Sequence, residues 1–176
     1  MAMERLVFLE KLRDSYSAYY NIYDNDGRTD LPLAFSADFL QRNESYWLSK
    51  KMVTWANETN EFCYVFSTEF FDRATVSKCI DFALDEGLPR VKPHKEHQYT
   101  NIKVIFIASA FDDDAVEEIQ SRKFSKSYNH SLWGYTNLLT GSVNLSSEKV
   151  TTNAAGHELK KYFRKLFKAL NAKAKP

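Results

Sequence analysis

Glycine is scarce in this sequence, which has 5 glycines among its 176 residues. No two of them are spaced to form a GxGxxG turn or a Walker-type phosphate loop, in which bare backbone must approach a phosphate. The GxSxG and HExxH motifs are absent as well. The sequence therefore contains no recognisable motif of a dinucleotide-binding enzyme, a P-loop nucleotidase, an α/β-hydrolase or a zinc protease.

Cysteines and long apolar runs are also rare. Cys63 and Cys79 form neither a CxxC pair nor a zinc-ligand spacing, and we expect Cys63 to be a buried, unreactive thiol. The longest uninterrupted apolar run, Val104–Ala108, is far shorter than the roughly 20 residues of a transmembrane helix. Glu4 and Glu10 interrupt the stretch that a signal peptide would need to be apolar. We therefore expect a soluble, cytoplasmic protein with no transmembrane segment.

The composition is typical of a globular domain, with 44% hydrophobic and 27% charged residues. A chain of about this length buries roughly 70% of the surface that its unfolded form exposes. We therefore predict one globular domain spanning residues 1–176.

Changes in hydrophobic periodicity divide the chain into helices and strands. Apolar residues recur every three or four positions from Phe8 to Tyr23 and every second position from Leu33 to Phe39. The run Ile102–Ile107 is apolar on both faces and predicts a central strand. The expected order is a helix (3–23), three strands (33–40, 46–56 and 61–68) joined by turns at 42–44 and 57–60, a helix (72–87), a strand (101–110), a short helix (112–122), two or three strands (124–145) and a helix (153–170). This order predicts an α+β fold with helices packed against a mixed or antiparallel sheet, the three early strands forming an antiparallel meander.

Charge is distributed unevenly along the chain. The net charge is +1, but acids exceed bases by two over residues 1–60 and by six over 61–121, whereas bases exceed acids by nine over 122–176. The last predicted helix has an apolar stripe and a basic side that includes Lys161, Arg164, Lys165 and Lys168. Basic amphipathic helices bind nucleic acids, anionic membranes or grooves of protein partners. The alternative is an ordinary solvated face, since cations are favoured near a helix C-terminus.

Three consecutive carboxylates, Asp112, Asp113 and Asp114, follow the predicted central strand. Carboxylates at the end of a strand could hold Mg²⁺. Acidic residues at a helix start also satisfy free backbone N–H groups and interact favourably with the helix dipole. Helix capping is the simpler interpretation of these three residues.

Histidines and aromatic residues give weaker signals. His94 and His97, with Glu96 between them, could contribute to a metal site, but they lie in a proline-containing loop that specifies no third ligand. Aromatic side chains can stack on bases or line a ligand pocket, although a tyrosine stripe at helical spacing is more often part of a core. The residues concerned are Tyr16, Tyr19, Tyr20, Tyr23, Trp47, Trp55 and Trp133.

Two stretches resemble a family of short prokaryotic proteins classed as a domain of unknown function. The first stretch is Ala37–Glu44, continuing to Asn60-Glu61-Phe62, and the second runs from Trp133-Gly134-Tyr135 through Val143-Asn144-Leu145 to Asn153 and Gly156. The resemblance covers most of the chain. It implies a single stand-alone domain and brings no activity, cofactor or catalytic residue.

The order of a helix, three strands, a helix and a strand also resembles the core of metal-dependent nucleases of the restriction-enzyme type. Those enzymes need an acid on one strand and an acid-x-Lys sequence on the next, which hold Mg²⁺ and position water. Asp38 could be the first acid and Glu61 the second, but Cys63 stands where lysine is required. A catalytically inactive relative fits this pattern better than an active nuclease.

These observations favour a non-enzymatic binding or accessory domain that contacts a protein or a polyanion through the basic last helix, with no cofactor. One alternative is a Mg²⁺-dependent phosphodiesterase that uses Asp38, Glu61 or the Asp112–Asp114 cluster. Another is a small-ligand binder with an aromatic pocket.

Overall fold

The computed structural model describes residues 4–46 and 53–173, and the side chains of residues 4–43 and 56–172. The described part of the chain contains the helices α1 (Arg5–Ser17), α2 (Arg73–Gly87), α3 (Asp113–Ser121) and α4 (His157–Lys173). The main sheet is formed by β1 (Asn21–Tyr23), β2 (Leu33–Tyr46), β3 (Val53–Ser67), β5 (His97–Ala108), β7 (Ser125–Ser127), β8 (Tyr135–Asn144) and β9 (Lys149–Thr152). A small parallel pair is formed by β4 (Phe70–Phe71) and β6 (Ala110–Phe111), and short 3₁₀ turns lie at Leu88–Arg90 and Ala154–Gly156. The predicted α+β class is confirmed.

The main sheet is mixed, with the strand order β1-β2-β3-β5-β8-β7 and with β9 paired to β8. β3, β5 and β8 are parallel to one another, whereas β1 and β2, β2 and β3, β7 and β8, and β8 and β9 pair antiparallel. Parallel neighbours need long crossover connections, and α2 and α3 lie in the two crossovers. None of the described helices is both long and apolar enough to cross a membrane.

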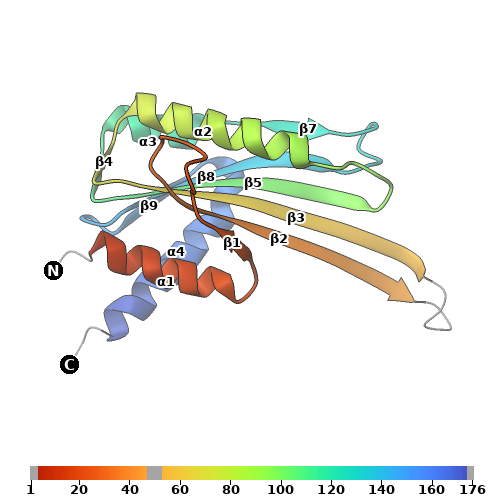
Figure 1. Ribbon diagram of the computed structural model, residues 1–176, viewed down its shortest axis with the longest axis horizontal. Helices are drawn as coiled ribbons and strands as arrows, with labels where there is room; N and C mark the ends of the chain where they lie inside the picture. The colour runs from red at the N-terminus through yellow and green to blue at the C-terminus, as the bar shows by residue number, and fades with distance from the viewer. Residues whose placement is uncertain (1–3, 47–52, 174–176) are drawn as a thin grey trace.

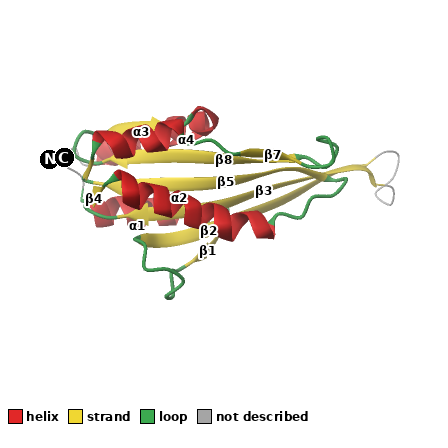
Figure 2. Cartoon of the chain, turned by 90° about the horizontal axis from the view of Figure 1, so that it is seen from above, coloured by secondary structure: helices red, strands yellow, loops and turns green. Residues whose placement is uncertain are grey.

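The helices cover the two faces of the sheet in pairs (Figure 1). α1 and α4 pack on one side, which we call the α1/α4 face, and α2 and α3 pack on the other, the α2/α3 face. Both helix pairs cover the same end of the sheet. The β2–β3 hairpin extends past the helices at the opposite end (Figures 1 and 2).

Strand β5 separates two hydrophobic cores. Ile105 and Ile107 are fully buried on the α1/α4 face, and Val104 and Phe106 are fully buried on the α2/α3 face. Successive side chains of a strand point to opposite faces, so a strand covered on both sides has no polar alternation. The predicted central strand is confirmed.

Two expected boundaries are wrong. The first helix ends at Ser17, and Asn21–Tyr23 instead forms strand β1 against β2. The predicted turns at 42–44 and 57–60 lie inside β2 and β3, so the three predicted strands are two long ones that pair as a hairpin. The third strand of the antiparallel meander is β1, which precedes them. The outer part of the hairpin extends past the helices, which lets the polar residues found there stay in strands (Figure 1). Residues 47–52 of the predicted second strand lie outside the described residues.

Candidate functional site

A cleft of about 590 Å³ opens on the α2/α3 face, beyond the C-terminal end of α2. Two adjacent strands and the connection that follows α2 build it. The lining residues are Leu40, Gln41 and Arg42 from β2, Glu58, Asn60 and Phe62 from β3, and Arg90, Lys92 and His94 from the connection. Three of them are arginine or lysine and one is an acid, so cations outnumber acids in the walls.

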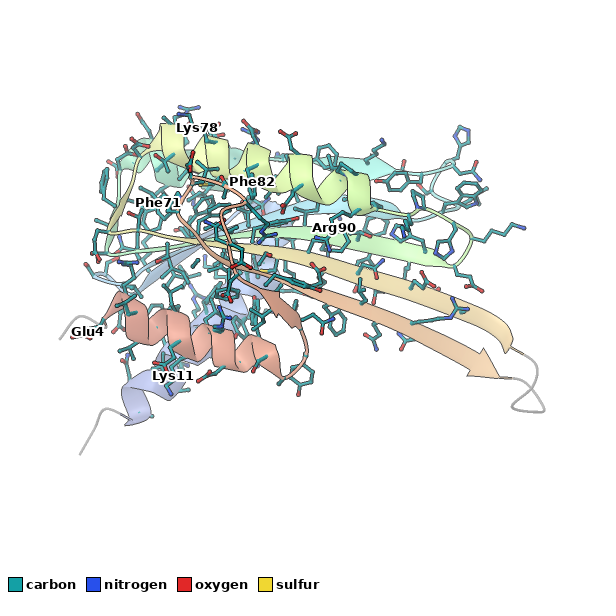
Figure 3. All side chains as sticks on the ribbon, viewed as in Figure 1. Glu4, Lys11, Phe71, Lys78, Phe82 and Arg90 are labelled. Carbon is teal, nitrogen blue, oxygen red and sulfur yellow. The ribbon has the colours of Figure 1, made fainter. Side chains whose placement is uncertain are left out.

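Arg90 is held in position by three neighbours. It forms an ion pair with Asp38, donates a hydrogen bond from Nη1 to the Tyr64 hydroxyl at 3.5 Å, and lies with its Cζ 4.0 Å from the centre of the Phe62 ring. The Asp38 side chain is 10% exposed and that of Arg90 39% exposed. In Figure 3, Arg90 lies near the end of α2, in the layer that also contains Phe71 and Phe82. A guanidinium has five N–H donors, so Arg90 keeps donors for a ligand after bonding Asp38 and Tyr64.

A second network forms the rim of the cleft. Glu58 accepts a hydrogen bond from Arg42 Nη1 at 2.6 Å, and its Oε2 lies 2.8 Å from Nε2 of His94. Partial burial by itself would raise the pKa of Glu58, but the hydrogen bonds and charges of Arg42 and His94 outweigh it and lower that pKa. Lys92 is exposed and forms no ion pair with a described residue. Glu58 is therefore ionised at neutral pH. It contacts Arg42 and His94 but neither Arg90 nor Lys92, the other two cations that line the cleft.

A family model described as a domain of unknown function (DUF8052) matches residues 4–165. The chain belongs to this family. The match includes every strand of the DUF8052 sheet and all nine residues that line the cleft. No curated protein and no solved structure matches the chain.

Asp38 and Glu61, the two acids suggested by the resemblance to nucleases, lie apart in the DUF8052 fold. Asp38 pairs with Phe62 in the register of β2 and β3. Neighbours along a strand alternate between faces, so Asp38 lies on the α2/α3 face and Glu61 on the α1/α4 face. Asp38 bonds Arg90, as described above, and Glu61 bonds Lys103. These two carboxylates cannot bind one metal ion together.

The Asp112–Asp114 cluster begins helix α3, at the end of the sheet opposite the cleft (Figure 1). Asp112 accepts a hydrogen bond from the Ala115 N–H at 2.6 Å and thereby caps the helix, and Asp113 and Asp114 are exposed in its first turn. Among residues 4–46 and 53–173, no group of three or more histidine, cysteine, aspartate or glutamate side chains is placed to hold a metal ion. The geometry of Asp112 therefore fits the capping interpretation.

Glu61 belongs to a polar cluster that the sequence did not reveal. Lys103 Nζ donates to Glu61 Oε2 at 2.6 Å, and the Tyr20 hydroxyl also donates to Glu61. The side chains of Lys103 and Glu61 are 11% and 15% exposed. Lys103 is the cross-strand neighbour of Cys63, so the lysine missing at position 63 is supplied by β5. The sequence signal for this cluster was Lys103, the single charge in a strand predicted to be buried on both faces, because a buried charge needs a partner of opposite sign.

Tyrosines surround this cluster. Tyr16 and Tyr20 stack with ring centres 4.6 Å apart. The pKa of the Tyr20 hydroxyl is raised, mainly by burial and in addition by the hydrogen bond with Glu61. Together with Tyr19, Tyr162 and Lys103, the two stacked tyrosines line a hollow of about 250 Å³. Tyr16 is buried and Tyr19 is exposed, so the predicted tyrosine stripe is only partly a core face.

The four predicted cations, which are among those of the last helix, share one surface. Lys161, Arg164, Lys165 and Lys168 are exposed on α4, while Leu159, Phe163 and Phe167 of the same helix are buried. No ion pair joins these cations to another described residue. The structure therefore brings this predicted set together on the α1/α4 side of the molecule, away from the cleft.

The remaining predicted residues do not form a site. His94 contacts Glu58 in the cleft, whereas His97 is buried with its ring nitrogens 2.7 Å from the Trp133 carbonyl and 2.9 Å from Thr100 Oγ1. The two free thiols, Cys63 and Cys79, are buried in different cores, and burial raises the pKa of each to about 12. The side chains of Trp47 and Trp55 lie outside the described residues. Trp133 is exposed.

Proposed function

We propose that this domain is a non-enzymatic, cytoplasmic binding domain whose ligand is a small molecule with a carboxylate or phosphate group and an apolar part. The observation that carries the proposal is Arg90, held by Asp38 over the Phe62 ring at the wall of the cleft of about 590 Å³. Arginine recognises carboxylates and phosphates through paired hydrogen bonds, and a prepositioned side chain loses less freedom on binding.

The size and walls of the cleft support this ligand class. Small-molecule sites usually measure about 300–1,000 Å³ and combine apolar walls with a few converging polar groups. Leu40, which is 63% exposed, provides apolar surface, while Phe62 is largely covered by Arg90. Lys92 adds a second cation to Arg90. Neither a metal nor a converging acid pair is needed for this function.

Thermal-shift assays with matched anionic and neutral compounds test the proposal. The probes are adenosine 5′-monophosphate against adenosine, and octanoate against octanol. We expect an anionic member to raise the melting temperature more than its neutral analogue, because only a ligand that prefers the native state stabilises it. Replacing Arg90→Ala should weaken binding at least about tenfold, since a hydrogen bond to a charged group contributes about 1.5–3 kcal/mol.

Two further variants make the Arg90 test specific. Arg90→Lys keeps the charge but loses the planar donor fork, so it should restore only part of the affinity. Arg73→Ala removes an arginine of α2 that pairs with Glu118 and does not line the cleft, so it should leave ligand affinity unchanged. Equal binding of the neutral analogues, no stabilisation by any probe, or full affinity in Arg90→Ala would each contradict the proposal.

A second candidate function is binding of a polyanion, or of an acidic protein partner, by the basic side of α4. It rests on the four exposed cations that lack ion pairs with described residues. Each phosphate that they neutralise would release condensed counterions, so the affinity for duplex DNA should fall steeply between about 50 and 200 mM salt. Combining Lys161→Gln, Arg164→Gln and Lys165→Gln should weaken binding and flatten the salt slope by about 1 per lost contact.

Fluorescence anisotropy with labelled duplex DNA measures both effects. The matched control replaces Lys11, Lys78 and Lys149 by glutamine. These lysines are exposed on other elements, so the substitutions remove the same amount of charge outside α4. Stability should barely change in either triple variant, since exposed charges contribute little to folding. If the wild-type protein binds neither DNA nor heparin at low salt, the basic side of α4 is a solvated surface.

A further inference from the structure

The outer edge of β2 is unusual because half of this long strand has no partner strand on the side opposite β3 among the described residues. β1 pairs only with Ser36, Ala37 and Asp38, so no strand in the described chain pairs with the edge from residue 39 to residue 46. Exposed edges are sites of strand addition, and proteins usually protect them with prolines, charged side chains, bulges or covering elements. Residues 39–46 contain no proline or lysine, and their two charged residues, Arg42 and Glu44, have opposite signs. Their pairing with β3 is regular from Phe39 to Ser45 and shifts only between Ser45 and Tyr46.

The direction of the free backbone groups follows from one hydrogen bond. The Glu58 N–H donates to the Glu96 carbonyl at 2.8 Å, on the β5 side of β3. The backbone N–H and C=O groups of Glu58 therefore point away from β2. Glu58 and Arg42, which lie opposite each other, are thus a pair without mutual backbone hydrogen bonds. In such a pair the N–H and C=O groups of Arg42 point outward, and regular alternation gives Leu40 and Glu44 the same direction.

The sequence of this edge is complementary to itself in one register. With Asn43 opposite Asn43 of a second copy, Arg42 lies opposite Glu44, and Gln41 lies opposite Ser45. The outward N–H and C=O groups of positions 42 and 44 then face each other, as an antiparallel ladder requires. Centring the pair on Arg42 would place two arginines opposite each other, and centring it on Gln41 would require Asp38, which already pairs with β1.

We propose that this domain forms a symmetric dimer by antiparallel pairing of the β2 edges around Asn43. Opposite charges directly across a strand pair stabilise it and like charges destabilise it. The twofold axis is perpendicular to the sheet, so both α2/α3 faces point the same way. The two sheets become continuous, and Leu40, which is 63% exposed in one chain, lies beside the junction. The inference is independent of the proposed ligand.

Disulfide trapping tests the register directly. The Asn43 pair has no mutual backbone hydrogen bonds, and such pairs have Cα atoms about 4.5 Å apart, within the range that a disulfide spans. Asn43→Cys should therefore form a cross-linked dimer under mild oxidation, because the native thiols are buried. Gln41→Cys is the matched control, since its symmetry mate is four positions out of register and should not cross-link.

Sedimentation velocity tests the charges without a cross-link. As the concentration of the wild-type protein rises, its apparent molecular mass should approach twice the 20.5 kDa of one chain. Glu44→Arg should weaken the dimer at least tenfold. Adding Arg42→Glu restores opposite charges across the junction but leaves Glu58 and Glu96 without their arginine, so it should recover only part of the loss. Glu117→Arg, the same charge reversal on the exposed side of α3, should have no effect. A wild-type monomer at all concentrations, or equal cross-linking of the two cysteine variants, would overturn the proposal.

Discussion

Replacing Ile105→Ala should lower the free energy of unfolding by about 2–5 kcal/mol, because removing a buried aliphatic side chain loses its burial and leaves a cavity. Ile105 has no exposed surface and belongs to the core between the sheet and helices α1 and α4. Its strand neighbours are Val65 and Gly141. Because the glycine has no side chain to move into the space, little relaxation is expected, and the loss should lie toward the upper part of the range.

Urea denaturation followed by circular dichroism measures this change. Leu132→Ala is the matched control, since Leu132 is 72% exposed and changes at exposed positions usually alter stability by less than about 0.5 kcal/mol. A loss below that value for Ile105→Ala would show that the core of the α1/α4 face is not packed as described.

Replacing Lys103→Met should cost about 3–5 kcal/mol, because it leaves the Glu61 carboxylate buried without its cation. The contact is short, at 2.6 Å, and both side chains are largely shielded from water. The double variant Lys103→Met, Glu61→Leu should recover much of the loss, since replacing a whole buried ion pair by apolar groups is often neutral or stabilising.

A double-mutant cycle in urea measures the coupling between the two positions. Lys78→Met is the control, because Lys78 is exposed on α2 (Figure 3) and its replacement should not alter stability. If the double variant were less stable than Lys103→Met alone, the pair would contribute more to stability than its apolar replacement. The cluster would then be a structural element of the fold.

The elements that sequence predicted well depend on local patterns. Strand β5 has an uninterrupted apolar run, and α4 has apolar residues at helical spacing, with Leu159, Phe163 and Phe167 all buried. The start of α2 follows from Asp72, whose carboxylate accepts a hydrogen bond from the Thr75 N–H at 2.7 Å. These features need only residues within one or two turns of each other.

The site depended on strand register, which local patterns do not specify. Asp38 and Arg90 are 52 positions apart, and Glu61 and Lys103 are 42 positions apart. A shift of one residue between β2 and β3 would change which acid faces the cleft. The sequence also placed turns inside β2 and β3, because polar residues on an exposed strand resemble those of a loop. The basic residues of α4 were found because they are contiguous on one helix.

The packing of α1 against α4 has a consequence during synthesis of the chain. Phe8 lies 5.2 Å from Phe167 between ring centres, and the Tyr162 hydroxyl donates to Ser15 across 147 positions. A helix as short as α1 is marginal in water without a partner. At about 5–20 residues per second, the ribosome needs roughly 7–30 s to reach α4 after making α1. During that interval Phe8 lacks its ring contacts with Phe163 and Phe167, so the nascent chain exposes an apolar side chain that α4 covers in the folded domain.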